Sequence, residues 1–251
     1  PSGFQTGVKL VQGFDINENG TTELTFDFDA SRSVVVAGRS GKYLLKPTIQ
    51  VLDTALATVI SGIVTRQADA GPVGGALVSV QVYDAAAADA KDQVAVLTST
   101  VTDDTDAARG RYKFFFAVAA PTTVNLVAGQ AGLLPRAARF QIENGTAYVK
   151  DFALAAAPDA GTVDLTIAGA AADAPVTLSF RQQATLEGEP VVIEVLSKSF
   201  VNGSYPADEA YRVTLPPGDY TVVASTADKA TLTLPVTVVK DVHAPLSVQF
   251  I

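Results

Sequence analysis

The chain has 251 residues and a formal net charge of −8, with one histidine and no cysteine, methionine or tryptophan. The missing thiols exclude disulfides, cysteine metal sites and cysteine nucleophiles, and the single histidine, His243, cannot build a two-histidine metal site. The acidic balance argues against nucleic acid as a partner, because binding it requires a basic face that displaces counterions.

Hydrophobic residues make up 48% of the chain and charged residues 18%, which is too apolar for a disordered polymer. No apolar run reaches the roughly 20 residues that span a bilayer. We therefore expect a folded protein with no membrane-spanning segment in this chain.

The first clear element is a strand over residues 22–29, where Leu24, Phe26 and Phe28 alternate with polar side chains. Such alternation buries one face and leaves the other in solvent, as in antiparallel sheets. The same pattern recurs at residues 77–83, 94–100, 176–180, 191–196, 220–224 and 231–239. Gly, Pro, Asn and Asp separate these runs at about 8 to 12 residues, as in β-sandwiches. The alanine-rich segments, such as 85–90, predict loops or single helical turns, because each is too short for a stable helix.

An internal repeat divides the chain. The segments that begin at Gly62 and Gly161 are each followed by a valine-rich strand, a strand with Tyr next to a basic residue, and a Lys-Asp tail. We align Val80 with Leu178 and Tyr112 with Tyr211. Two copies of this kind predict tandem sandwiches at residues 57–158 and 159–251, preceded by a partial β domain at residues 1–56.

Short motifs in both copies resemble the carboxypeptidase regulatory-like family. They are Ser-Gly-Ile-Val at 61–64, Gly-Arg-Tyr at 110–112 and Pro-Gly-Asp-Tyr-Thr-Val at 217–222. The resemblance implies a transthyretin-like or Ig-like β-sandwich for each copy.

The first segment resembles the C-terminal part of a lipoprotein family, domain of unknown function 4382. The matching motifs lie at residues 1–10, 13–16, 24–34 and 41–49. This resemblance implies an exported envelope protein, on the outer surface or in the periplasm, that meets a membrane only through a lipid anchor outside this chain. It supplies no catalytic residues. A family domain would have a further N-terminal half, so the first domain is expected to be incomplete. Processing, trimming, or completion by strands of another chain would each explain that, and the last would build filaments.

Two acidic segments are candidate calcium sites. Asp15, Asn17 and Asn19 match the opening of a calcium loop, although Phe26 stands where such a loop needs a bidentate glutamate. An Asn-Gly turn explains the same residues more simply. The second segment is an acidic loop that contains Asp103, Asp104 and Asp106. A solvated loop is the favoured interpretation of this segment. No cofactor is expected, and calcium is the one candidate considered.

Catalytic chemistry has few candidates. No Gly-x-Ser-x-Gly elbow accompanies His243, which we interpret as a strand-end residue. Carboxylate pairs that could hydrolyse glycosides occur at Glu187, Glu189 and Glu194, but the first two flank an apparent turn. We therefore predict that the chain is not an enzyme.

A binding role has one candidate loop. Tyr205 and Asn202 lie in an Asn-Gly-Ser-Tyr-Pro segment, and a flat aromatic ring at a loop tip suits stacking on a sugar. Lys150 and Lys240 could donate to isopeptide cross-links, but we do not favour this, because the Asp after each lysine lies on the opposite face of the strand.

The sequence thus predicts a non-catalytic, extracellular structural or adhesive protein, such as a stalk or filament subunit assembled by strand complementation. Its expected partners are other protein chains, including copies of itself, which join at exposed strand edges. The alternative is a carbohydrate-binding module of an envelope lipoprotein, with glycans as partners.

Overall fold

The computed structural model describes residues 24–28, 34–37, 42–45, 49–53, 57–171, 174–201 and 212–251, and its regular structure there is almost entirely β-strand. The exception is a 3-10 helix, η2 (Ala90–Gln93), at the end of the alanine-rich segment 85–90. Asp89 caps it by accepting a hydrogen bond from the Lys91 amide. The predicted all-β class is confirmed, and no described helix is long and apolar enough to cross a bilayer.

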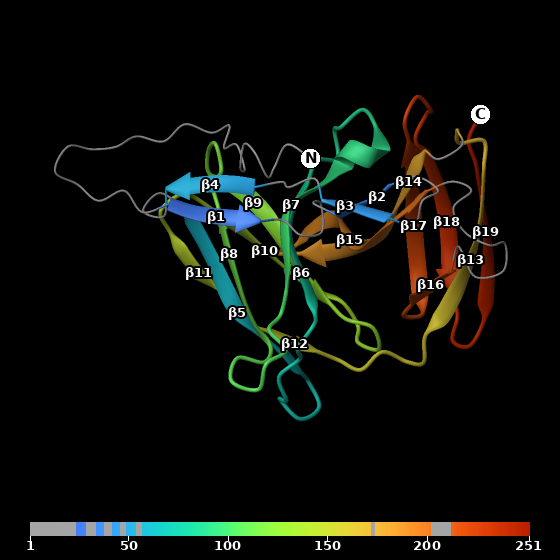
Figure 1. The fold of residues 1–251 in the computed structure, drawn as a ribbon. Helices are drawn as coiled ribbons and strands as arrows, with labels where there is room; N and C mark the ends of the chain where they lie inside the picture. The colour runs from blue at the N-terminus through green and yellow to red at the C-terminus, as the bar shows by residue number, and fades with distance from the viewer. Residues whose placement is uncertain are drawn as a thin grey trace.

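Among the described residues before 57, four short strands form two antiparallel pairs. β1 (Leu24–Phe28) pairs with β4 (Ile49–Asp53), and β2 (Val34–Ala37) pairs with β3 (Lys42–Leu45). β1 coincides with the strand predicted over residues 22–29. In Figure 1, β1 and β4 lie beside the first of two sandwiches.

The first sandwich packs a four-stranded sheet of order β10-β9-β6-β7 against a sheet in which β5 pairs with β8, β11 and β12. Val78, Val80 and Leu126 of the first sheet meet Ile60 and Phe114 of the second, and all five are buried. The strands are β5 (Thr58–Arg66), β6 (Leu77–Tyr83), β7 (Val94–Val101), β8 (Arg111–Phe116), β9 (Thr122–Gly129), β10 (Arg136–Ile142), β11 (Ala147–Val149) and β12 (Phe152–Leu154).

The second sandwich repeats this arrangement, with sheets of order β15-β14-β17-β18 and β16-β13-β19 (Figure 1). Leu178, Phe180 and Val222 of the first sheet pack on Val163 and Val248 of the second. The strands are β13 (Gly161–Ala168), β14 (Pro175–Leu186), β15 (Glu189–Val201), β16 (Arg212–Leu215), β17 (Gly218–Thr226), β18 (Leu232–Val238) and β19 (His243–Gln249).

Strand pairing relates the two sandwiches residue by residue. Each has a bulge at the equivalent place: β7 has one extra residue opposite Val80 and Gln81 of β6, and β15 has one opposite Phe180 and Arg181 of β14. The bulges make Val80 equivalent to Phe180, two residues away from the Leu178 predicted by alignment. The strand partner of Gly62 is Tyr112, and that of Gly161 is Leu215. Tyr112 is therefore equivalent to Leu215 and not to Tyr211, so the predicted alignment of these two strands was wrong.

The last strands of each sandwich run parallel to the first, which differs from the purely antiparallel sheets expected. β11 and β12 pair in parallel with β5, and β19 pairs in parallel with β13. The physical reason is a crossover: after β10 or β18 the chain passes to the opposite sheet, and then runs in the same direction as its opening strand.

The polar sides of β6 and β14 were expected in solvent and are buried instead. Ser79 and Gln81 are 5% and 1% exposed, and Ser179 and Arg181 are 6% and 3% exposed. The two sandwiches pack against each other through these sheets, and β15 lies between them (Figure 1).

Candidate functional site

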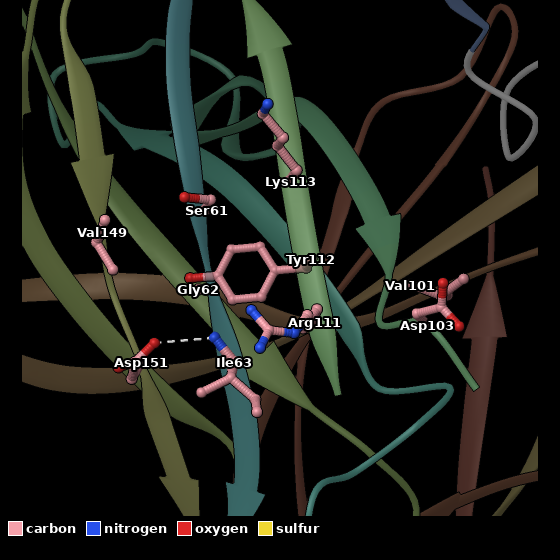
Figure 2. A pocket seen from close by; sticks show the side chains of 10 residues that line it. All are labelled: Ser61, Gly62, Ile63, Val101, Asp103, Arg111, Tyr112, Lys113, Val149 and Asp151. Atoms are coloured by element: carbon pink, nitrogen blue, oxygen red, sulfur yellow. Dashed lines mark hydrogen bonds between the residues drawn. The ribbon is translucent and has the colours of Figure 1, made fainter. Parts of the chain in front are cut away.

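An open groove of about 730 Å³ lies on the outer face of the β5–β8–β11 sheet. Figure 2 shows the side chains that line it, most of them on these three strands. Two of them, Val101 and Val149, are unusually exposed for valine, at 62% and 70%. The lining is Ser61, Gly62, Ile63, Val101, Asp103, Arg111, Tyr112, Lys113, Val149 and Asp151.

The base of the groove lies where the chain between β11 and β12 runs alongside β5. The Lys150 amide donates to the Ser61 carbonyl at 2.9 Å, and the Ile63 amide donates to Asp151 Oδ1 at 2.9 Å (Figure 2). The buried Tyr112 hydroxyl donates to the Lys150 carbonyl. Burial raises the pKa of Tyr112 well above its usual value, with a smaller contribution from the Asp151 charge, so this hydroxyl stays protonated as a donor.

Asp103 and Lys113, two ionisable side chains of the groove, have structural partners. Asp103 accepts hydrogen bonds from the Thr105 amide and hydroxyl at 2.7 and 2.6 Å, and these bonds lower the pKa of Asp103. Lys113 Nζ lies 4.4 Å from the centre of the Phe115 ring. The described groove therefore offers charged and apolar surface, but its polar groups are arranged as turn and strand contacts.

His243 is the first residue of β19, as predicted. Its Nδ1 lies 2.9 Å from Asp164 Oδ2, and Arg212 Nε lies 3.2 Å from Asp164 Oδ1. The hydrogen bond with His243 lowers the pKa of Asp164, and the charges of His243 and Arg212 add to this effect. The three side chains come from adjacent strands and link them on an exposed sheet face.

The acidic candidates for calcium do not converge. Asp104 pairs with Arg109 at 2.8 Å, while Asp103 turns back to Thr105. In the part of the chain that the structure describes, no three acidic or histidine side chains gather closely enough to hold a metal, and this includes Asp106. Asp15, Asn17 and Asn19 lie outside the described residues, so the calcium loop stays a prediction.

The carboxylates weighed for glycoside hydrolysis serve the fold in two different places. Glu187 and Gly188 form the two-residue turn between β14 and β15, and both have positive φ, at 52° and 80°. Glu194 instead accepts a hydrogen bond from the Ser179 hydroxyl. Whether the chain has an enzymatic activity stays an untested expectation.

The glycan candidates Tyr205 and Asn202 lie outside the described residues, so that hypothesis also stays a prediction. The isopeptide candidates have other partners: Lys150 Nζ lies 4.6 Å from the Phe140 ring centre, and Lys240 pairs with Asp159.

Sequence reasoning missed the contact between the sandwiches, in which Gln81 and Arg181 take part. One signal was available: Ser79-Val80-Gln81 and Ser179-Phe180-Arg181 both place a large polar residue two positions after a serine in an apolar strand. Alternation alone assigned these side chains to solvent.

Comparison with known proteins gives one family. Residues 1–47 match the family described as Domain of unknown function (DUF4382). The match confirms the resemblance found for the first segment and leaves the family of the two sandwiches open. No curated protein matches the chain in sequence.

Solved structures with similar folds include the Bacillus anthracis TIE protein, at 14% identity and a TM-score of 0.29, covering 83% of this chain and 39% of that one. A streptococcal ancillary pilin has 14% identity and a TM-score of 0.31, covering 83% and 65%. The shaft pilin SpaA of Lactobacillus rhamnosus GG has 10% identity and a TM-score of 0.28, covering 78% and 97%. The chain thus spans less than two thirds of the first two proteins, and similarities this low transfer no function or partner to it.

Proposed function

We propose that this chain is a non-catalytic structural or adhesive protein of the cell surface, whose two sandwiches carry mechanical load. The observation that carries the proposal is the parallel pairing of the first and last strands in each sandwich. The chain enters at one end of this strand pair and leaves at the opposite end. Tension on the chain would therefore slide the two strands past each other and load their hydrogen bonds together, whereas an antiparallel pair pulled from one end opens bond by bond.

The second sandwich provides the longer strand pair. All of the seven-residue β19 pairs with β13, from His243 opposite Thr162 to Gln249 opposite Ala168. The ion pair and hydrogen bond that join Asp164 to Arg212 and His243 cross-link three strands of the same sheet. Both features oppose sliding of the terminal strand.

The first sandwich splits its parallel pairing between β11 and β12, with three residues each. The interruption at Lys150 and Asp151 is bridged by their hydrogen bonds with Ser61, Ile63 and Tyr112. The hydrogen-bonded backbone at the base of the groove thus keeps the terminal strand attached to β5 along its length.

Location and partners belong to the same proposal. The DUF4382 match at residues 1–47 supports export, because the lipoprotein resemblance implies it. Other protein chains are the partner class that we propose, joined by strand addition. The edges β18 and β19 are poor sites for this, because Pro235 and Pro245 lie in their centres and lack the amide that a new strand would need.

Force spectroscopy on the full chain tests the load-bearing role, and the absence of native cysteine allows handles to be placed by design. Thr162→Cys with Gln249→Cys pulls β13 and β19 in shear, whereas Thr162→Cys with His243→Cys pulls apart neighbours at one end of the same pair. With handles on reduced thiols, we expect a severalfold higher rupture force in shear. Equal forces in the two geometries would refute the proposal.

A further inference from the structure

Equivalent sheets of the two sandwiches face each other, and the side chains between them are buried. On the first sandwich Ser79 and Gln81 are at most 5% exposed, although they lie on the side of the sheet away from its own core. On the second, Ser179 and Arg181 are similarly covered. Burial of polar groups on this scale is favourable only when they are hydrogen-bonded.

Gln81 makes two of these bonds across the interface. Its Nε2 donates to the Glu194 carbonyl at 2.7 Å, and its Oε1 accepts from the Glu194 amide at 2.9 Å. The side-chain amide therefore binds the β15 backbone as a neighbouring strand would. Nε2 also donates to Ser79 Oγ at 2.8 Å, which fixes its orientation.

Arg181 reaches across the interface in the opposite direction, from the position equivalent to Gln81. Its Nη1 donates to the Ala90 carbonyl at 2.6 Å and its Nη2 to the Lys91 carbonyl at 3.1 Å, both on η2 of the first sandwich. Its Nε donates to Ser179 Oγ at 2.8 Å. Burial lowers the pKa of Arg181, while the charges of Glu194 and Asp92 oppose this, and a guanidinium remains charged in proteins. Separating the sandwiches would break these hydrogen bonds and expose the side chains to water.

Apolar contacts close the interface around the two polar side chains. Val127 of β9 packs on Val191 and Ile193 of β15, and all three are at most 5% exposed. At another point Thr231 of the second sandwich lies near enough to Asp89, beside η2, to lower the pKa of that carboxyl. The contacts therefore involve several elements of each sandwich, and a hinge motion would break all of them.

We propose that Gln81 and Arg181 lock the two sandwiches into one rigid unit, with a fixed relative orientation rather than a hinge. Because each sandwich uses the equivalent face, the pair closes on itself and this face is unavailable to a third sandwich. The proposal concerns the mechanics of the chain and stands apart from the cell-surface role, since it would hold for a protein of any location.

Distance measurement between spin labels tests this on the full chain. Labels at Lys113→Cys on β8 and Thr233→Cys on β18 occupy exposed strand positions, one on each sandwich. The expected result is a single narrow distance distribution in the otherwise native chain. In Gln81→Met/Arg181→Met, which replaces both polar side chains by apolar ones of similar length, we expect a clearly broader distribution.

Arg212→Met is the matched control, because Arg212 is an exposed arginine that pairs with Asp164 inside one sandwich. Its distribution should stay as narrow as that of the native chain. A broad distribution in the native chain, or an equally narrow one in the double variant, would overturn the proposal. The native-chain measurement decides the question even if the double variant fails to fold.

Discussion

Tyr112 and Gly62 are strand partners, and the Tyr112 hydroxyl lies where a side chain on Gly62 would have to go. A Cβ at Gly62 would meet the Lys150 carbonyl oxygen at 1.8 Å and the Tyr112 hydroxyl at 2.9 Å. The equivalent Gly161 would meet the Val239 carbonyl at 2.2 Å. In both sandwiches the glycine thus lets the backbone of the closing segment approach the first strand closely.

Gly62→Ala should therefore destabilise the chain by about 2 to 3 kcal/mol, because backbone must move to admit one methyl group. Urea unfolding followed by circular dichroism measures the change. Gly129→Ala is the control, since its added Cβ would meet only Pro135 at 3.7 Å. If Gly62→Ala loses no more stability than Gly129→Ala, the Lys150 backbone is not tightly packed against Gly62.

Tyr220 predicts an alkaline limit to stability. Its hydroxyl donates to the Pro216 carbonyl at 2.8 Å, and burial raises the pKa of Tyr220 to about 12. A tyrosine pKa that is higher in the folded chain than the ordinary value of about 10 favours folding below pH 10. Its contribution falls as the pH rises from about 10 towards 12.

Unfolding free energies measured between pH 8 and about 11 should show this decline, with a smaller slope in Tyr220→Phe. The near-ultraviolet absorbance of tyrosinate in the native and Tyr220→Phe chains would report the titration directly. If the two chains lose stability in parallel, the decline has another source.

The pKa of Asp89 is sensitive to the interface and predicts a loss of stability at low pH. Hydrogen bonds from Lys91 and then from Thr231 lower the pKa of Asp89 to about 2. A carboxyl pKa below its ordinary value favours folding above about pH 4, and this contribution disappears as the pH falls towards 2. Because Thr231 belongs to the other sandwich, Thr231→Val should raise the pKa of Asp89, measured by carboxyl NMR. Thr233→Val, on the exposed side of β18, should leave it unchanged, and an equal shift in both variants would contradict the contact.

Alternation predicted several of the strands, among them β6 and β14, and one buried face for each. On that face of β6 the structure buries Val78 and Val80 completely. Alternation could not place the polar face, because Ser79 and Gln81 alternate in the same way whether they meet water or another sandwich. Hydrogen-bonded polar side chains at an interface have no distinctive spacing.

Strand register and strand direction could not be predicted from the sequence, for related reasons. Sliding a strand by two residues keeps every side chain on its face, so Val80 aligns with Leu178 as well as with its true equivalent, Phe180. A strand of alternating residues such as β19 has the same pattern in parallel and antiparallel pairs. Its direction depends on the crossover that precedes it. The groove over Gly62 was likewise missed, because it depends on contacts between residues far apart in the sequence. Ile63 and Asp151, for example, are 88 positions apart.

Cooperative unfolding is the last prediction, and it concerns Gln81 and Arg181. If the two sandwiches form one unit, the native chain should unfold in a single transition by fluorescence and circular dichroism. Arg181→Met removes the bonds to η2, and Gln81→Met removes those to β15. Each variant should lower the free energy of unfolding by roughly 1 to 3 kcal/mol, because the lost hydrogen bonds leave buried groups unpaired. In the double variant the curve should separate into two transitions, one for each sandwich.

A double-mutant cycle should give a non-zero coupling energy, because both side chains hold the same interface although they bind different elements. Strictly additive losses with a single transition in all four chains would mean that the sandwiches are joined by contacts other than these two.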